Sequence, residues 1–140
     1  MRKVFCDTDI CLDMLGAREP YYTDAAILFS LGDKGHIRVF VSALTISHLY
    51  YLLQKQHNIS EARRIIQQFN LLVKILPVDK KIVELALLSS FKDFEDALQH
   101  FCALEAGMPI FLTRNLKDYA NSRIPVMTAS AFLRTLDFSE

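Results

Sequence analysis

Short apolar runs alternate along the chain with longer stretches in which apolar residues recur every three or four positions. The short runs are rich in β-branched and aromatic residues, which predicts strands. We expect these strands at residues 4–6, 37–41, 73–77, 109–112 and, more weakly, 124–127. The longer stretches have the period of amphipathic helices. We expect these helices at residues 9–15, 20–31, 42–53, 60–72, 79–87, 93–105 and 128–136. Four of them are expected to begin at the N-caps Ser42, Ser60, Asp79 and Thr128.

Strands separated by helices favour a parallel sheet that is covered on both faces. The pattern therefore predicts an α/β fold, a three-layer α/β/α sandwich around a central, mostly parallel sheet of four or five strands. Its 140 residues fit one domain over 1–140. No apolar run reaches the about 18 residues of a membrane span. The three apolar residues before Asp7 are too few for a signal peptide, so we expect a cytoplasmic protein.

Charge and cysteine content narrow the function classes. The net charge is zero, which argues against a broadly basic nucleic-acid-binding domain but leaves room for a local basic rim. Cys6, Cys11 and Cys102 lie in apolar surroundings, and their spacing fits neither a zinc site nor a CxxC motif. We expect them to be buried as small hydrophobic residues.

Acidic residues stand at the predicted ends of strands and helices. Asp7 comes directly after the first strand, and two further acidic segments follow at 92–96 and 113–118. In open α/β sheets, ligands bind beyond the carboxyl ends of the strands. Carboxylates gathered there need a counter-charge, and Mg²⁺ prefers oxygen ligands. One or two such ions can activate water and clamp a phosphodiester for hydrolysis.

The helix expected from Asp93 places residues 93, 96 and 100 on one face. Asp93, Asp96 and His100 are expected to point outward, while Glu95 points away from that acidic face.

Simpler interpretations exist for most of these acids. Asp93 and Asp96 can also be explained as the cap and first-turn residues of a helix, where acids are favoured. Asp118 suits a turn in a polar loop. Asp9 is expected to cap the first short helix, and Asp13 to be a solvated helix residue.

Other polar residues accompany the acids. Side chains expected to orient them by hydrogen bonds are Thr8, Thr113 and Asn115. The candidates for phosphate contacts are Arg18, Arg114 and Lys117. Each of these residue types, taken alone, is more often a solvated surface charge. His48 lies on a helix whose other face is apolar, where a single histidine is more often structural.

Four segments in order resemble the motifs of the PIN domain family. These are residues 4–9 with Leu12 and Asp13, then 42–45, 93–98 and 112–119. The resemblance covers most of the chain and implies a Mg²⁺- or Mn²⁺-dependent ribonuclease. Many small bacterial members of that family are toxins of the VapC type, neutralised by an antitoxin and often dimeric.

Under this resemblance, Asp7 corresponds to the first metal-binding acid of the family and Asp96 to the third. The second acid is expected within residues 45–49, which contain no carboxylate, and His48 stands near its place. Imidazole is a poorer ligand for Mg²⁺ than for Mn²⁺. The position of the fourth acid is occupied by Asn115.

Three functions remain open from the sequence. In the leading hypothesis, an endoribonuclease, Asp7, Asp96 and Asp118 hold the metal and Asp93 supports them. In the second, a PIN-like module binds RNA or a protein without cleaving. In the third, Asp7 and Asp9 form the nucleophile motif of a haloacid dehalogenase-type phosphatase, although position 11 is cysteine where threonine or valine is expected.

The expected partners are RNA, an antitoxin protein and a second copy of the chain. The bulky cluster at residues 50–53 suits a dimer interface or the core equally well.

Overall fold

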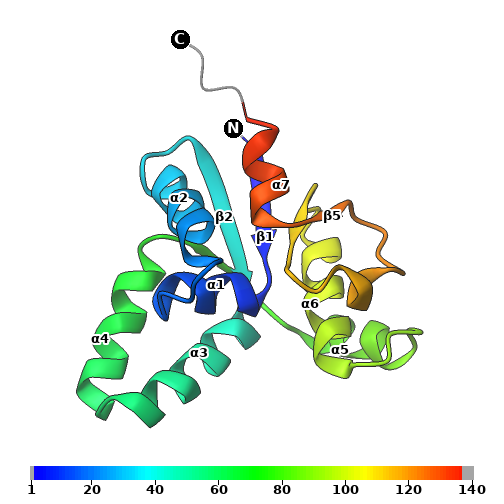
Figure 1. Cartoon of the computed structure of the whole chain (residues 1–140). Coiled ribbons are helices and arrows are strands. Elements are labelled where there is room, and N and C mark those ends of the chain that lie inside the picture. The colour runs from blue at the N-terminus through cyan, green and yellow to red at the C-terminus, as the bar shows by residue number, and fades with distance from the viewer. Residues whose placement is uncertain (1, 137–140) are drawn as a thin grey trace.

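The computed structural model describes residues 2–136 and contains a five-stranded sheet. Its strands are β1 (Arg2–Cys6), β2 (Ile37–Ser42), β3 (Lys74–Leu76), β4 (Phe111–Leu112) and β5 (Val126–Met127). All neighbours are parallel, in the order β3-β2-β1-β4-β5 (Figure 1). The prediction of a parallel sheet is confirmed. The last three strands are shorter than predicted, because Pro77, Pro109 and Pro125 have no N–H to extend the ladder.

Seven α-helices and one 3₁₀ helix accompany these strands within the described residues. They are α1 (Thr8–Leu15), α2 (Tyr22–Asp33), α3 (Ala43–Gln56), α4 (Ile59–Asn70), α5 (Lys80–Leu87), α6 (Phe94–Glu105), η1 (Leu116–Tyr119) and α7 (Ala129–Arg134). Every predicted helix is present. Over residues 2–136, none is both long and apolar enough to cross a membrane.

Most helices begin at a polar side chain that accepts a backbone N–H of the first turn. The predicted caps Ser42, Asp79 and Thr128 are confirmed, each accepting the N–H three residues ahead. The predicted cap Ser60 is wrong: Asn58 caps α4, accepting the Glu61 N–H at 2.8 Å, so the helix begins one residue before Ser60.

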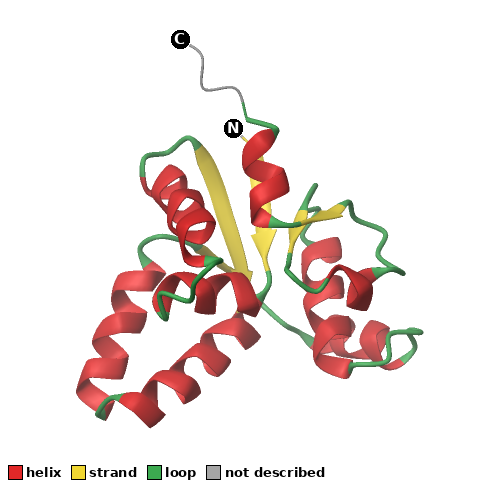
Figure 2. Cartoon of the chain, in the orientation of Figure 1, coloured by secondary structure: helices red, strands yellow, loops and turns green. Residues whose placement is uncertain are grey.

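The side chains of the central strands alternate between two cores. Val4, Cys6, Val41 and Leu112 pack with α1, α2, α3, α4 and α7. The intervening aromatic residues Phe5, Phe40 and Phe111 pack with α5, α6 and η1. Figures 1 and 2 show these helix groups on opposite sides of the sheet. The three-layer α/β/α sandwich is thereby confirmed, and the three cysteines are free and buried as expected.

β1 is the strand at which the direction of winding reverses. The chain leaves β1 through α1 and α2 to reach β2 on one side, and later returns through α6 to β4 on the other. Ligands in open sheets bind at such a switch point, beyond the carboxyl ends of the strands. Asp7 follows β1 there, Thr113 follows β4, and Ser42 ends β2.

Candidate metal-binding site

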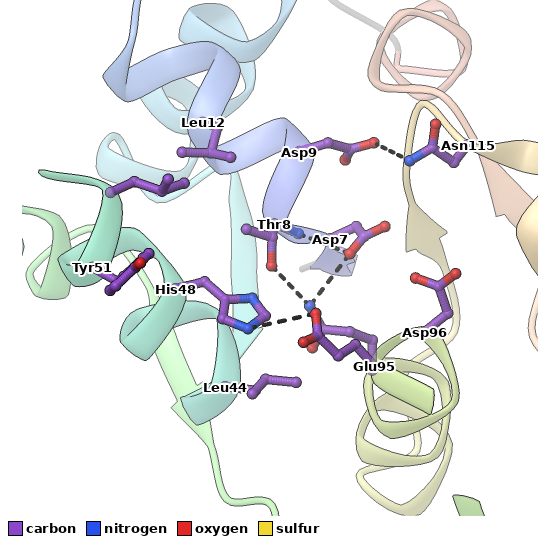
Figure 3. Close-up of a pocket in the computed structure, with 12 residues that line it drawn as sticks. Asp7, Thr8, Asp9, Leu12, Leu44, His48, Tyr51, Glu95, Asp96 and Asn115 are labelled. Carbon is purple, nitrogen blue, oxygen red and sulfur yellow. Dashed lines mark hydrogen bonds and ion pairs between the residues drawn. The ribbon is translucent and has the colours of Figure 1, made fainter. Parts of the chain in front are cut away.

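A cleft of about 370 Å³ opens at this edge of the sheet (Figure 3). Its carboxylates are Asp7, Asp9, Glu95 and Asp96. The wall of the cleft beside these carboxylates is formed by α1 and α3. It is largely apolar and includes His48. The other residues that line the cleft are Thr8, Leu12, Leu44, His48, Tyr51, Leu52, Gln99 and Asn115.

Asp7 is held by four hydrogen-bond donors. Its Oδ1 accepts from Thr8 N at 2.8 Å and from Gln99 Nε2 at 3.3 Å. Its Oδ2 accepts from Thr113 Oγ1 at 2.8 Å and from Tyr119 Oη at 3.2 Å. An ionised carboxylate offers about four lone-pair positions, so these donors saturate it. The Thr8 contact also makes Asp7, rather than Asp9, the N-cap of α1, and the prediction for Asp9 is wrong.

Tyr119 joins Asp7 to Asp96. Its hydroxyl lies 3.2 Å from Asp7 Oδ2 and 3.2 Å from Asp96 Oδ1. A phenol has one hydrogen and can satisfy one of two ionised acceptors at a time. The sequence did not single out Tyr119, although it follows Asp118 within the motif.

Asp9 bridges α1 to the loop after β4. Its Oδ2 accepts from Arg114 N at 2.9 Å and from Asn115 Nδ2 at 3.4 Å. Its Oδ1 is buried, and no described residue donates to it. A buried carboxylate oxygen without a donor favours a cation or a proton nearby.

Burial and mutual repulsion raise the pKa values of these acids. Burial raises the pKa of Asp9 to about 6, and the charge of Asp7 adds to the effect. Burial also raises the pKa of Asp96 to about 6, with Asp93 contributing. The pKa of Asp7 is raised mainly by burial, against the lowering effect of its hydrogen bonds. These acids therefore hold a proton more readily than exposed carboxylates, although the nearby charge of Arg114 partly lowers the pKa of Asp9.

Gln99 connects the acids to α3 through neutral polar groups. It is 3% exposed. Its Nε2 lies 2.8 Å from Thr45 Oγ1 and 3.1 Å from Thr8 Oγ1, and its Oε1 accepts from Ser42 Oγ. These groups fill the side of the site that faces α3, where the family resemblance places a second acid. Gln99 was missed because position 99 was not assigned to the acidic helix face.

The prediction of which side chains of α6 face the site is wrong at one position: Gln99, and not His100, contacts Asp7. His100 is 1% exposed rather than outward. Its ring packs on Phe91 and Phe101, and its Nε2 accepts from Arg123 N at 3.1 Å. Burial lowers the pKa of His100 to about 4, which keeps it neutral.

Glu95 turns into the cleft instead of away from it, contrary to the prediction. Its Oε2 lies 3.5 Å from Nε2 of His48 on α3, so the two walls of the cleft meet there (Figure 3). His48 thus lies at the cleft and half-buried, with an acidic partner.

The remaining predicted acids lie beside the cleft rather than in it. Asp93 caps α6, accepting from Asp96 N at 3.0 Å, which confirms the simpler interpretation of Asp93. Asp93, Lys117 and Asp118 are exposed and border an adjoining hollow of about 400 Å³, which Asp96 also lines. Asp118 is not among the residues that line the cleft with Asp7.

Arg114 forms a two-pronged ion pair with Asp13. Its Nε and Nη2 donate to the two carboxylate oxygens at 2.8 and 3.0 Å, and its guanidinium lies 4.1 Å from the ring centre of Tyr21. Asp13 is 1% exposed, so its prediction as a solvated residue is wrong. The guanidinium of Arg114 faces Asp13, whereas Arg18 is exposed in the loop after α1.

The acids fit a hard divalent cation in their chemistry. Their metal-binding atoms are carboxylate oxygens, Asp9 Oδ1 has no hydrogen-bond donor within residues 2–136, and one hydroxyl is shared by two carboxylates. Among residues 2–136, no three or more His, Cys, Asp or Glu side chains are grouped to hold a metal ion. Mg²⁺ commonly takes one or two carboxylates and completes its shell with water. Asp7 and Asp96 fit a site of that kind.

In the metal-free protein, Asp96→Asn is expected to be more stable than wild type near pH 8, with the advantage shrinking toward about pH 5. The folded-state pKa of Asp96 is about 6, above its ordinary 3.8. Folded wild type therefore binds more protons than unfolded wild type in this window and gains stability as the pH falls, and the variant lacks that gain. Urea unfolding with a chelator at several pH values measures the difference. His100 is present in both proteins and cancels, so a pH-independent difference would contradict this assignment.

Comparison with known proteins places this geometry in a family. A family model of the PIN domain matches residues 3–117. No curated protein shows significant sequence similarity to the chain.

Solved structures share the fold. A chain from a toxin–antitoxin complex of Klebsiella pneumoniae is 22% identical, with a TM-score of 0.67, over 90% of this chain and 97% of that one. A chain from FitAcB of Neisseria gonorrhoeae is 18% identical, with a TM-score of 0.69, over 91% and 98%. VapC20 of Mycobacterium tuberculosis, described as a toxin that cleaves the sarcin–ricin loop, is 18% identical, with a TM-score of 0.60, over 77% and 86%. The match of the family model over most of the chain is decisive: the chain belongs to the PIN domain family.

Proposed function

We propose that this PIN domain is a metal-dependent endoribonuclease whose centre is the Asp7–Asp96 pair. The observation that carries the proposal is the position of these two acids. They meet through one hydroxyl at the switch point of the sheet, where ligands of open α/β sheets bind. Support also comes from VapC20, which has the same fold and is described as a toxin that cleaves the sarcin–ricin loop.

The polar residues around Asp7 and Asp96 have separate roles in this proposal. Asp7 and Asp96 would hold the ion, which when bound supplies an activated water and charge for the phosphate. Thr8 and Thr113 orient Asp7 through the hydrogen bonds described above. Asn115 steadies Asp9.

The outlying charged residues are given supporting roles. Asp93 and Asp118 add negative charge near Asp96, since both contribute to the raised pKa of that acid. Arg18 and Lys117 are exposed and are proposed to contact the RNA backbone.

A protein partner and a dimer belong to the same proposal. The similar chain from Klebsiella pneumoniae comes from a toxin–antitoxin complex, so we propose an antitoxin as the partner and a cytoplasmic location. The cluster at residues 50–53 is divided between core and surface, since Leu53 is 8% exposed and Tyr51 is 60% exposed. We therefore propose exposed Tyr51 as a contact residue for a protein partner or a second copy of the chain.

A second candidate is a PIN module that binds RNA without cleaving it. The saturation of Asp7 by four donors favours this reading, because a cation must displace one of them. The two candidates differ in whether the protein cleaves the RNA that it binds when a divalent cation is present.

Incubation of the purified protein with labelled single-stranded RNA separates them. We expect cleavage with Mn²⁺ or Mg²⁺ and none with a chelator, and a duplex of the same sequence serves as the control substrate. RNA binding without cleavage at any cation concentration would support the second candidate. Hydrolysis of an aryl phosphate instead of RNA would point to a phosphatase.

A further inference from the structure

We propose that the Tyr119 hydroxyl competes with the divalent cation for the space between Asp7 and Asp96. Tyr119 is then the positioning residue that sets how tightly this centre holds its metal. The inference rests on the metal site of the proposed function, and it concerns affinity for the ion rather than cleavage of RNA.

The hydroxyl is held in place by the core beneath it. Tyr119 is 2% exposed, and its ring centre lies 4.4 Å from that of Phe111 and 6.0 Å from that of Phe91. A ring packed in this way has no open space into which to turn. The oxygen is therefore kept 3.2 Å from both carboxylates by packing as well as by hydrogen bonds.

The position of this donor distinguishes it from the others on Asp7. Thr8 N belongs to the helix backbone, and Gln99 Nε2 reaches Oδ1 from the α3 side. Thr113 and Tyr119 both donate to Oδ2, but Thr113 also reaches Asp9, whereas the Tyr119 hydroxyl also contacts Asp96. A cation that contacts both acids has to displace this hydrogen bond or share its oxygens.

Replacement of the Tyr119 hydrogen bond by a cation changes the metal affinity in a predictable direction. In the metal-free protein the hydroxyl donates to one or the other of two carboxylates that repel each other. In the metal-bound protein the cation takes over that role. Removal of the hydroxyl therefore costs the metal-free state more than the metal-bound state, and the affinity for the cation rises.

Tyr119→Phe tests this because it removes the hydroxyl and keeps the ring. Titration calorimetry with Mn²⁺ is expected to show binding tighter on the order of tenfold, the worth of one hydrogen bond to a charged group. The melting temperature of the metal-free variant is expected to fall and to recover with Mn²⁺ by more than that of wild type. Tyr22→Phe, the same chemical change on the exposed first turn of α2, is the matched control and should leave the affinity unchanged.

Several outcomes would overturn the inference. Unchanged or weaker Mn²⁺ binding by Tyr119→Phe would do so, as would absence of binding by both proteins. Asp96→Asn in the Tyr119→Phe background should remove the gain, and a gain that persists would place the ion elsewhere. Because no readout uses RNA, failure of the ribonuclease proposal is seen separately in the cleavage assay.

Discussion

An Asp7→Asn protein is expected to fold normally and to cleave RNA more than about 100-fold more slowly than wild type. Loss of partners outside the metal ligands already costs about 10- to 100-fold in such sites. Asp7 is proposed as a ligand itself, and asparagine has one oxygen acceptor and no charge. Initial rates of cleavage in saturating Mn²⁺ measure the effect.

The structure explains why this variant should remain folded. The new carbonyl oxygen can accept from Thr8 N and Gln99 Nε2, while its NH₂ group faces the hydroxyls of Thr113 and Tyr119. Both hydroxyls can accept, and each can turn its hydrogen to another carboxylate. Burial raises the pKa of Asp7, so a neutral side chain also removes a buried charge. Equal or higher stability near pH 8 is the control, and unimpaired cleavage would remove Asp7 from the metal centre.

Arg114→Ala is expected to lower the free energy of unfolding by about 3 kcal/mol, the low end for one partner removed from a buried ion pair. The substitution leaves Asp13, which is 1% exposed, without the guanidinium that covers both of its oxygens. It also removes the contact with the Tyr21 ring. Chemical denaturation measures the change.

A double-mutant cycle with Asp13→Ala isolates the pair itself. If the loss comes from the unpaired carboxylate, Asp13→Ala with Arg114→Ala should be more stable than Arg114→Ala alone. Arg64→Ala breaks the exposed pair with Glu61 and should change stability little. Equal effects of Arg64→Ala and Arg114→Ala would show that burial of Asp13 does not matter.

The layered fold was accessible from the sequence because its signals are local and repeated. Alternating strands and helices, together with caps such as Ser42 and Thr128, defined the sandwich. Asp7 was accessible for a related reason, since an acid after a buried strand in a parallel sheet faces the ligand edge.

The partners of Asp7 were not accessible, because they depend on tertiary contacts. A rotation of α6 by one position exchanges His100 for Gln99 at the site, and helical spacing alone does not fix that rotation. Asp13 was misjudged because its partner, Arg114, lies 101 positions away in the sequence. The role of Tyr119 could not be predicted either, because its ring packs in the core while its hydroxyl contacts Asp7 and Asp96.

The location of Asp7 directly after the central strand also links the site to the cooperativity of folding. Its amide donates to Leu112 O at 2.9 Å, and the Phe5 amide donates to Ile110 O at 2.9 Å. Such amides in a buried central ladder exchange with solvent only when the domain opens globally. The proposed ligands Asp7 and Asp96 are joined there by the Tyr119 hydroxyl, with Asp96 contributed by α6 and Tyr119 by η1. The Asp7 side of the proposed centre is therefore expected to be among the last regions to open, and slow exchange of the Asp7 amide would show it.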